Sequence, residues 1–201
     1  MTPPDHLVVF VKAPRLGRVK SRLARDIGAV AAWAFYRRTL AAVLRRLAGR
    51  GRWRAWIAAT PDGWAAGHGP WPDGWRVVAQ GPGDVGERMD RVMVELPPGR
   101  VVIVGTDIPG LCRRHVEDAF AALGRHDAVF GPAADGGYWL VGLRRRPRVP
   151  RLFRNVRWSS EHALADTRAN LRPGETAAYL EVLEDIDDGA ALARWRRKTG
   201  R

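Results

Sequence analysis

Leu7-Val8-Val9-Phe10-Val11 is a run of five apolar residues near the start of the chain. A half-exposed strand alternates apolar and polar residues, whereas an unbroken apolar run is typical of a strand covered on both faces. Parallel sheets bury their strands in this way because the helices that connect the strands lie on both faces. The run therefore predicts a buried strand in a largely parallel sheet.

The rest of the chain repeats this alternation of strand and helix patterns. Residues 29–48 place Trp33, Leu40 and Leu47 on one side and arginines on the other, as an amphipathic helix requires. Further strands are expected at 53–59, 75–79, 101–104, 127–130 and 138–143, and further helices at 85–96 and 113–123. This order predicts an α/β fold, one domain over residues 1–201, with ligands beyond the carboxyl ends of the strands.

The composition excludes several classes of protein. Of 201 residues, 46% are hydrophobic, which is more than an extended disordered chain carries. No apolar run approaches the roughly 18 residues that a membrane span needs. The first residues lack the basic patch and cleavage site of a signal peptide, so a cytoplasmic protein with no membrane span is expected. The single cysteine, Cys112, can form neither an internal disulfide nor a thiolate metal site alone.

The formal net charge of +13 raises nucleic acid as a partner. Of the 34 basic residues, however, only Lys12, Lys20 and Lys198 are lysines. Such a bias toward arginine is the residue usage of a high-GC genome and needs no nucleic acid to explain it. Aromatic residues interleaved with the basic clusters, on which bases would stack, are missing. The basic excess leans toward residues 1–100, which a polyanionic small ligand would explain as well as a nucleic acid would, and a nucleic-acid partner is not expected.

A cluster of cations follows the first strand directly. Its members fall within eleven positions and are Lys12, Arg15, Arg18, Lys20 and Arg22. A helix is predicted to start near Val19, and Gly17 allows a ligand to approach the backbone. Free N–H groups at a helix start, flanked by Lys and Arg, suit a di- or triphosphate. The alternative is a basic surface turn, and the spacing of a Walker loop is absent.

Two later loops carry carboxylates. Asp107 lies just past the apolar run 101–104, where it is placed to hold Mg²⁺ or Mn²⁺ through oxygen. The alternative is that Asp107 caps a helix with Pro109 in its first turn. Asp135 precedes two glycines, so a plain Asp-Gly turn competes with a role at the same metal or at an acceptor hydroxyl. The strand at 138–143 is expected beside the strand that leads to Asp107.

These loops together resemble the bacterial radical-SAM/selenodomain-associated transferases, also described as arsenosugar-biosynthesis glycosyltransferases, which are relatives of the GT-A nucleotide-diphospho-sugar transferases. The resemblance runs over most of the chain and rests on FVKAPRLGRVKSRLA from Phe10, QGPGDVGERM from Gln80, GTDIPGL from Gly105, GPAADGGYWLVGL from Gly131 and Trp158-Ser159-Ser160. It implies a Rossmann-like GT-A fold that binds a nucleotide in its N-terminal half.

The resemblance also implies roles for individual residues. Contacts to the nucleotide and its phosphates fall to Lys12, Arg15, Gly17, Lys20, Arg22, Gln80, Gly81, Arg88 and Thr106. Catalytic roles fall to Lys20, Asp107 and Asp135, and the acceptor side to Tyr138, Trp158 and Ser159. The divalent cofactor, Mg²⁺ or Mn²⁺, would be held by Asp107, with Asp135 and Asp187 as further candidate ligands.

Two activities stay open at this point. The preferred interpretation is a metal-dependent glycosyltransferase with a nucleotide-diphospho-sugar donor and a small-molecule acceptor. The alternative is a nucleotidyltransferase that joins an NMP to a phosphorylated or sugar acceptor and releases pyrophosphate. Thr106-Asp107-Ile108 keeps this alternative open, because it offers one carboxylate where many GT-A glycosyltransferases carry a DxD pair. In both reactions a metal and Lys/Arg donors stabilise charge on the leaving group. A nucleic-acid-binding protein is a third alternative.

Overall fold

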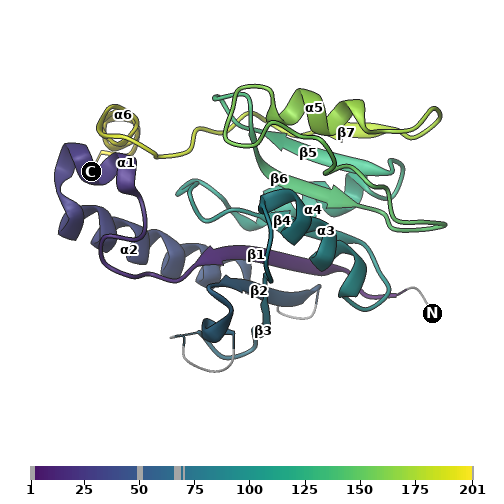
Figure 1. Ribbon diagram of the computed structural model, residues 1–201, viewed down its shortest axis with the longest axis horizontal. Coiled ribbons are helices and arrows are strands. Elements are labelled where there is room, and N and C mark those ends of the chain that lie inside the picture. The colour runs from purple at the N-terminus through teal and green to yellow at the C-terminus, as the bar shows by residue number, and fades with distance from the viewer. Residues whose placement is uncertain (1–2, 49–51, 66–68, 70, 201) are drawn as a thin grey trace.

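A seven-stranded sheet with the order β3-β2-β1-β4-β6-β5-β7 forms the centre of the computed structural model (Figure 1). The structure describes residues 3–48, 52–65, 69 and 71–200. The strands are β1 (His6–Lys12), β2 (Arg54–Thr60), β3 (Arg76–Ala79), β4 (Val101–Val104), β5 (Ala128–Pro132), β6 (Tyr138–Leu143) and β7 (Ala177–Tyr179). Neighbouring strands run parallel except at β6, which is antiparallel to both β4 and β5.

Strand β1 lies inside the sheet, as its unbroken apolar run predicts. It pairs with β2 on one side and β4 on the other, so that Leu7 lies opposite both Ala55 and Val102. The chain builds β1, β2 and β3 outward in one direction and then crosses back to place β4 on the other side of β1. This reversal of strand order opens a crevice at the carboxyl ends of β1 and β4, where sheets of this kind bind ligands.

Helices cover both faces of the sheet. They are α1 (Ser21–Ile27), α2 (Ala29–Leu47), α3 (Val85–Glu95), α4 (Arg113–Ala122), α5 (Ala163–Ala169) and α6 (Gly189–Thr199), with a short 3₁₀ helix η1 (Asp62–Trp64). On one face, Leu40 of α2 and Phe120 of α4 pack on Leu7 and its neighbours. On the other face, Met93 of α3 packs against Val8. Alternate residues of β1 therefore enter two separate cores.

A third, smaller core lies beyond the carboxyl end of β1. It joins Leu23 of α1, Phe35 of α2, Leu192 of α6 and Ile186 from the segment that leads into α6. Figure 1 shows α1 and α6 side by side at this end of the molecule. This core fixes the segment around Ile186 against α1, although the two are far apart in the sequence.

The α/β class and the mostly parallel sheet with helices on both faces are confirmed. The expected strand set was incomplete, because β7 adds a seventh strand to the edge of the sheet beside β5. This strand has only three residues, which is too short to show a periodic pattern. Helix α1 begins at Ser21, two residues after the expected start.

Trp64 and Trp71, which belong to the loop between β2 and β3, pack against the core. Trp71 donates from Nε1 to the carbonyl of Trp64 at 3.0 Å, and both side chains pack on the core between α2 and the sheet. Residues 66–68 and 70 of this loop lie outside the described residues.

Among the described helices, none combines the length and the apolar character needed to cross a membrane.

Candidate functional site

The ammonium of Lys20 is the centre of the candidate site. Its Nζ lies 2.9 Å from an oxygen of Asp107 and 2.7 Å from an oxygen of Asp187. The Lys20 side chain is 5% exposed, whereas the two carboxylates are 47% and 39% exposed. A buried cation is thus held between two carboxylates that remain accessible to solvent. The cation cluster after β1 and the carboxylate after β4 therefore converge as expected.

The backbone of Lys20 is in the left-handed conformation, with φ 50° and ψ 47°. A residue other than glycine adopts this backbone conformation at a cost of about 1–2 kcal/mol, and such strain is common at functional sites. Lys20 occupies the N-cap position of α1, where no side-chain cap is present. The side chain of this residue forms the ion pairs to Asp107 and Asp187.

Two opposing effects act on the pKa of Lys20. Burial disfavours the charged ammonium and lowers the pKa, while the charges of Asp107 and Asp187 and their hydrogen bonds raise it. The carboxylates prevail, so the pKa of Lys20 is raised above its usual value. Lys20 is therefore a permanent cation at neutral pH and an electrostatic group in this site.

A hollow of about 400 Å³ surrounds this ammonium, and we call it the cationic cavity. Its lining residues are Phe10, Lys12, Val19, Lys20, Ser21, Arg22, Tyr36, Gly105, Thr106, Asp107 and Asp187. Arg22 extends the network, with Nη1 3.6 Å from Asp187. Three cations and two carboxylates thus face one hollow at the carboxyl end of β1.

Tyr36 supports the floor of the cationic cavity. Its hydroxyl donates to the backbone carbonyl of Lys12 at 2.7 Å and accepts a long hydrogen bond of 3.5 Å from Thr106 Oγ1. Burial raises the pKa of Tyr36 to about 12, so it stays neutral and keeps its proton to donate. The hydroxyl joins the end of β1 to the turn that carries Asp107.

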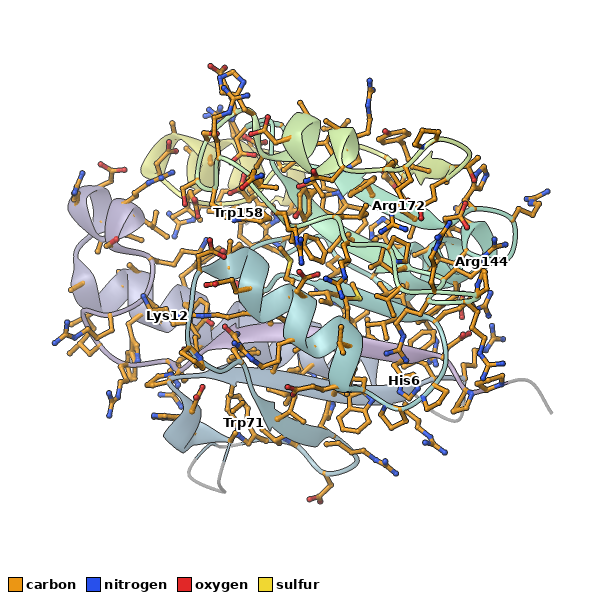
Figure 2. All side chains as sticks on the ribbon, turned by 45° about the vertical axis from the view of Figure 1, so that its right-hand side comes forward. His6, Lys12, Trp71, Arg144, Trp158 and Arg172 are labelled. Carbon is orange, nitrogen blue, oxygen red and sulfur yellow. The ribbon has the colours of Figure 1, made fainter. Side chains whose placement is uncertain are left out.

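A second hollow of about 280 Å³, the acidic cavity, adjoins the first and shares Phe10, Gly105 and Asp107 with it. Its other lining residues are Val85, Met89, Ile103, Ile108, Ala133, Asp135, Gly137, Tyr138, Trp139, Leu140, Val141, Trp158, Ser159, Ser160, Ala163 and Asp185. Figure 2 shows Lys12 and Trp158 toward the end of the sheet opposite His6. Because Asp107 lines both hollows, it lies between the cationic cavity and the acidic cavity.

Asp135 sits in the turn between β5 and β6. Its Oδ1 accepts a hydrogen bond from the N–H of Gly137 at 2.9 Å, so the expected Asp-Gly turn is present and the carboxylate still lines the acidic cavity. The two interpretations of Asp135 are thus compatible. Asp107, in contrast, does not cap a helix, because α4 begins six residues later with Cys112 at its N-cap. The Asp107 side chain instead pairs with Lys20 and lines both hollows.

Asp185 belongs to the carboxylate-rich segment 183–188, which resembles an element that closes the site in related enzymes, but no specific role was predicted for it. It lines the acidic cavity, and burial together with the nearby charges of Asp187 and Asp135 raises its pKa to about 6. The segment 183–188 is rich in carboxylates, but its sequence alone does not show which of them face inward. Asp188 turns away and caps α6 by accepting from the N–H of Ala191 at 2.8 Å.

Several predicted nucleotide-binding residues lie outside both cavities as the structure defines them. Gln80 is 4% exposed and donates from Nε2 to the carbonyls of Ala58 and Val11 at 2.8 and 3.4 Å, so it joins strand ends within the sheet. Gly81 donates its N–H to Asp62, and Arg88 donates to the carbonyl of Gly83. Arg15 and Gly17 are exposed in the turn before α1. Their predicted contacts stay predictions.

Asp107 and Asp187 supply the carboxylate oxygens that Mg²⁺ or Mn²⁺ prefers, and in this structure both contact the Lys20 ammonium. Asp107 and Asp187 already direct carboxylate oxygens at one cationic point, and hard cations are held by one or two carboxylates plus substrate phosphates. Among the described residues, no group of three or more His, Cys, Asp or Glu side chains could hold a metal ion. Asp135 is therefore not brought into one ligand set with Asp107 and Asp187.

Solved structures share this architecture. A candidate nucleotide-diphospho-sugar transferase from Desulfovibrio desulfuricans G20 has a TM-score of 0.86 and 30% identity, over 97% of this chain and 87% of that one. Rv0371c from Mycobacterium tuberculosis H37Rv, in a complex with manganese, has a TM-score of 0.60 and 16% identity over 96% and 98% of the two chains. The second likeness shows the fold alone.

A nucleotidyltransferase has the same fold. The 4-diphosphocytidyl-2C-methyl-D-erythritol synthase from Anaerococcus prevotii DSM 20548 has a TM-score of 0.62 and 10% identity, over 98% of both chains. No curated protein matches this sequence. The fold is therefore that of nucleotide-sugar transferases and nucleotidyltransferases, while the association with radical-SAM or arsenosugar proteins finds no counterpart in these matches.

The family is shown by a match over more than half of the chain. Residues 43–160 match the family model described as an uncharacterised protein conserved in bacteria, DUF2064. The matched range contains Asp107 and Asp135 and ends at Ser160, the last residue of the Trp158-Ser159-Ser160 motif (the Trp158 segment). The chain belongs to the DUF2064 family.

Proposed function

We propose that this protein is a metal-dependent glycosyltransferase that moves a sugar from a nucleotide-diphospho-sugar to a small-molecule hydroxyl acceptor. The observation that carries the proposal is the position of Asp107, which contacts the Lys20 ammonium at 2.9 Å and lines both cavities. A diphosphate in the cationic cavity and an acceptor in the acidic cavity would meet at this residue.

In the proposed reaction the acceptor oxygen forms a bond to the anomeric carbon of the sugar. The bond from that carbon to the diphosphate oxygen breaks, and the nucleoside diphosphate leaves with the electron pair. The proton of the acceptor hydroxyl passes to water. Lys12, Lys20 and Arg22 offset the charge that grows on the leaving group, in a site where Lys20 is already fixed before substrate binds.

Asp107 and Asp187 would hold the divalent cation, which would add Lewis-acid stabilisation of the same leaving group. Asp135 is fixed by its hydrogen bond from Gly137 and would orient the acceptor hydroxyl. Tyr138 keeps its proton, because burial raises its pKa, and its hydroxyl lies 3.4 Å from Thr167 Oγ1. It would form a neutral wall of the acceptor side rather than an acid or a base.

Nucleotidyl transfer is the second candidate. It is favoured by the single carboxylate in Thr106-Asp107-Ile108 and by the fold shared with the A. prevotii synthase, whose name describes a diphosphocytidyl product. The same cations would then stabilise pyrophosphate as the leaving group. Release of inorganic pyrophosphate from a plain NTP and an acceptor would establish this reaction, whereas release of a nucleoside diphosphate from a nucleotide-sugar would establish glycosyl transfer.

The test is a thermal-shift panel of nucleoside diphosphates, triphosphates and nucleotide-sugars, each with and without Mg²⁺ or Mn²⁺. A ligand at about 100 times its Kd adds about 2.7 kcal/mol of stability, which corresponds to a Tm rise of roughly 5–10 °C for a chain of this size. We expect Asp107→Asn to lose the metal-dependent part of the rise. Asp118→Asn, at an exposed aspartate paired with Arg114, is the matched control. A metal-dependent shift that survives in the Asp107 variant would contradict the proposal.

A further inference from the structure

The acidic cavity differs from the cationic cavity in its charge. Asp107, Asp135 and Asp185 are its charged lining residues, and the described lining contains no Lys, Arg or His. Apolar side chains form most of the rest. The nearest cation in the network, Lys20, is already paired with two carboxylates. A ligand of this hollow therefore meets negative charge at one side and an apolar surface at the other.

The apolar side is a rigid aromatic wall. The Trp158 ring meets the Tyr138 ring edge to face, with centroids 6.4 Å apart. The first turn of α3 presses against the same indole, because a Cβ built at Gly86 would lie 2.5 Å from Trp158 Cζ2 and 2.8 Å from the carbonyl oxygen of Phe153. Only a glycine lets α3 and the Trp158 segment approach so closely, so the indole is held in place before a ligand binds.

The acidic side is also fixed in advance. Gly136 has a positive φ of 86°, and a Cβ there would lie 2.2 Å from the carbonyl oxygen of Glu161. The carbonyl of Gly136 accepts from the N–H of Leu164 at 3.1 Å. The turn that carries Asp135 is thus joined to the chain just after Trp158. Both walls of the hollow are preformed, which is expected of a small-molecule site.

From these features we infer the class of acceptor, a conclusion that rests on the proposed function. The acceptor is a small hydroxyl compound with an apolar ring or face, either neutral or carrying an amine, and it is not a phosphate ester. The ring packs on Trp158, and the hydroxyl or ammonium faces Asp107, Asp135 and Asp185. A phosphate ester would bring a dianion against carboxylates with no cation in the described lining to offset it.

Three matched probes test the inference: benzyl alcohol, benzylamine and benzyl phosphate. They carry the same benzyl ring and differ in the group attached to it, which is neutral, cationic or anionic. Their binding is followed by NMR on the indole N–H signal of Trp158, which Trp158→Phe identifies by its loss. We expect benzyl alcohol and benzylamine to shift this signal and to bind at least about tenfold more tightly there than benzyl phosphate does. Tighter binding of benzyl phosphate, or no binding of any of the three, would overturn the inference.

The cationic cavity could attract the phosphate ester by itself. The titrations are therefore repeated on the double variant Lys12→Ala/Arg22→Ala, which lacks two of the three cations of that cavity. The order of the probes at Trp158 should be unchanged. Each titration is also repeated with MgCl₂. If Mg²⁺ makes benzyl phosphate the tightest of the three probes, the carboxylates serve to recruit phosphate through the metal and the inference fails.

Single substitutions distinguish the contribution of the aromatic wall to probe binding from that of the carboxylates. Trp158→Ala should weaken all three probes, with benzyl alcohol bound about tenfold less tightly, as judged by ligand-observed NMR. Trp71→Ala, at a tryptophan packed against Trp64, is the matched control and should leave binding unchanged. Asp135→Asn should weaken benzylamine and leave benzyl alcohol within about twofold. Equal effects of Asp135→Asn on the two probes would contradict the assigned charge.

Failure of the inference and failure of the proposed function give different results. Binding of benzyl alcohol and benzylamine in a protein that binds no nucleotide would remove the glycosyltransferase proposal and keep the binding preference of the acidic cavity. Transfer of a sugar to phosphorylated acceptors alone would keep the glycosyltransferase and overturn the inferred class of acceptor.

Discussion

Lys20 combines three features that single residues seldom share. It has a left-handed backbone, a buried ammonium, and two carboxylate partners from distant parts of the chain. Local sequence preference opposes the first feature, and desolvation opposes the second. The ion pairs to Asp107 and Asp187 are what make the arrangement stable. The same ion pairs hold a cation at the point where the two cavities meet.

We expect a measurable energetic coupling between Lys20 and Asp187. Lys20→Met should lower the free energy of unfolding by about 1–3 kcal/mol at neutral pH, because two carboxylates then lose their shared cation; their exposure keeps the loss below that of a fully buried pair. In a double-mutant cycle with Asp187→Asn, measured by urea unfolding, the coupling energy should be about 1 kcal/mol.

The exposed pair Arg114 and Asp118, four residues apart on α4 and 3.6 Å in separation, is the matched control. Its coupling energy should not exceed about 0.5 kcal/mol, since exposed pairs are screened by solvent. A coupling energy at Lys20 no larger than at this control would show that the ammonium is not held by its carboxylates.

Among the helices and strands, the sequence predicts those that have a long periodic pattern or an unbroken apolar run. The apolar run 7–11 and the amphipathic pattern 29–48 correspond to β1 and α2. The three-residue strand β7 and the seven-residue helix α5 do not have enough positions to establish a period, so their places depend on tertiary contacts. Helix α3 begins at Val85, as predicted, directly after its N-cap residue Asp84, whose side chain forms a capping box with Glu87.

Part of the candidate site could likewise be predicted from the sequence, and part could not. The position of Asp107 after a buried strand and of Lys20 in the cation cluster could be read from the chain, because both follow strands that meet at one edge of the sheet. The partnership of Lys20 with Asp187 spans 167 positions and depends on how α6 packs on α1. Asp185 shows the same limit, since nothing local in 183–188 distinguishes an inward carboxylate from a cap.

The edge strand β7 depends on Asp127, which precedes β5. The pKa of Asp127 is lowered, and the largest cause is the hydrogen bond from the backbone N–H of Thr176. The positive charge of Arg144 lowers the pKa further. Because the pKa of the folded state lies below the usual 3.8, this carboxylate stabilises the fold above that pH, and the stabilisation is lost as the pH falls through the lowered value.

Asp127→Asn should therefore reduce the free energy of unfolding by about 1 kcal/mol at pH 6, and the gap to the wild type should close as the pH falls below 3.8. Urea unfolding at a series of pH values measures this. Asp73→Asn, at an exposed aspartate, should follow the wild type throughout. A gap that persists in acid would mean that Asp127 acts through packing rather than through its charge.

At the scale of the whole molecule, the charge of +13 is distributed over many local interactions. Arg100 pairs with Asp5 at 2.7 Å, and Arg157 pairs with Asp166 at 2.8 Å. Arg145 is buried and donates to the carbonyls of Met93 and Leu96, where it closes the end of α3. Structural interactions of this kind account for part of the arginine content. The cations of the candidate site form a separate, discrete group around the cationic cavity.

The small core beyond β1 should couple overall stability to the site. Leu192 is 2% exposed and packs with Ile186, the residue immediately before Asp187. Leu192→Ala should lower the free energy of unfolding by about 3 kcal/mol, and it should also loosen the segment that places Asp187 beside Lys20. Binding of inorganic pyrophosphate with Mn²⁺, measured by calorimetry, should therefore weaken by about fivefold.

Leu47→Ala provides the matched control for this coupling. Leu47 is fully buried at the end of α2, in the core between that helix and the sheet, and its carbonyl accepts from Trp53 just before β2 begins. That position is at the amino end of the strands, away from the cavities. The loss of stability should be similar, about 3 kcal/mol, while the affinity for pyrophosphate stays unchanged. If both variants bound pyrophosphate equally well, the third core would be a packing element with no part in positioning Asp187; if both bound it equally weakly, the effect would follow global stability and not the geometry of the site.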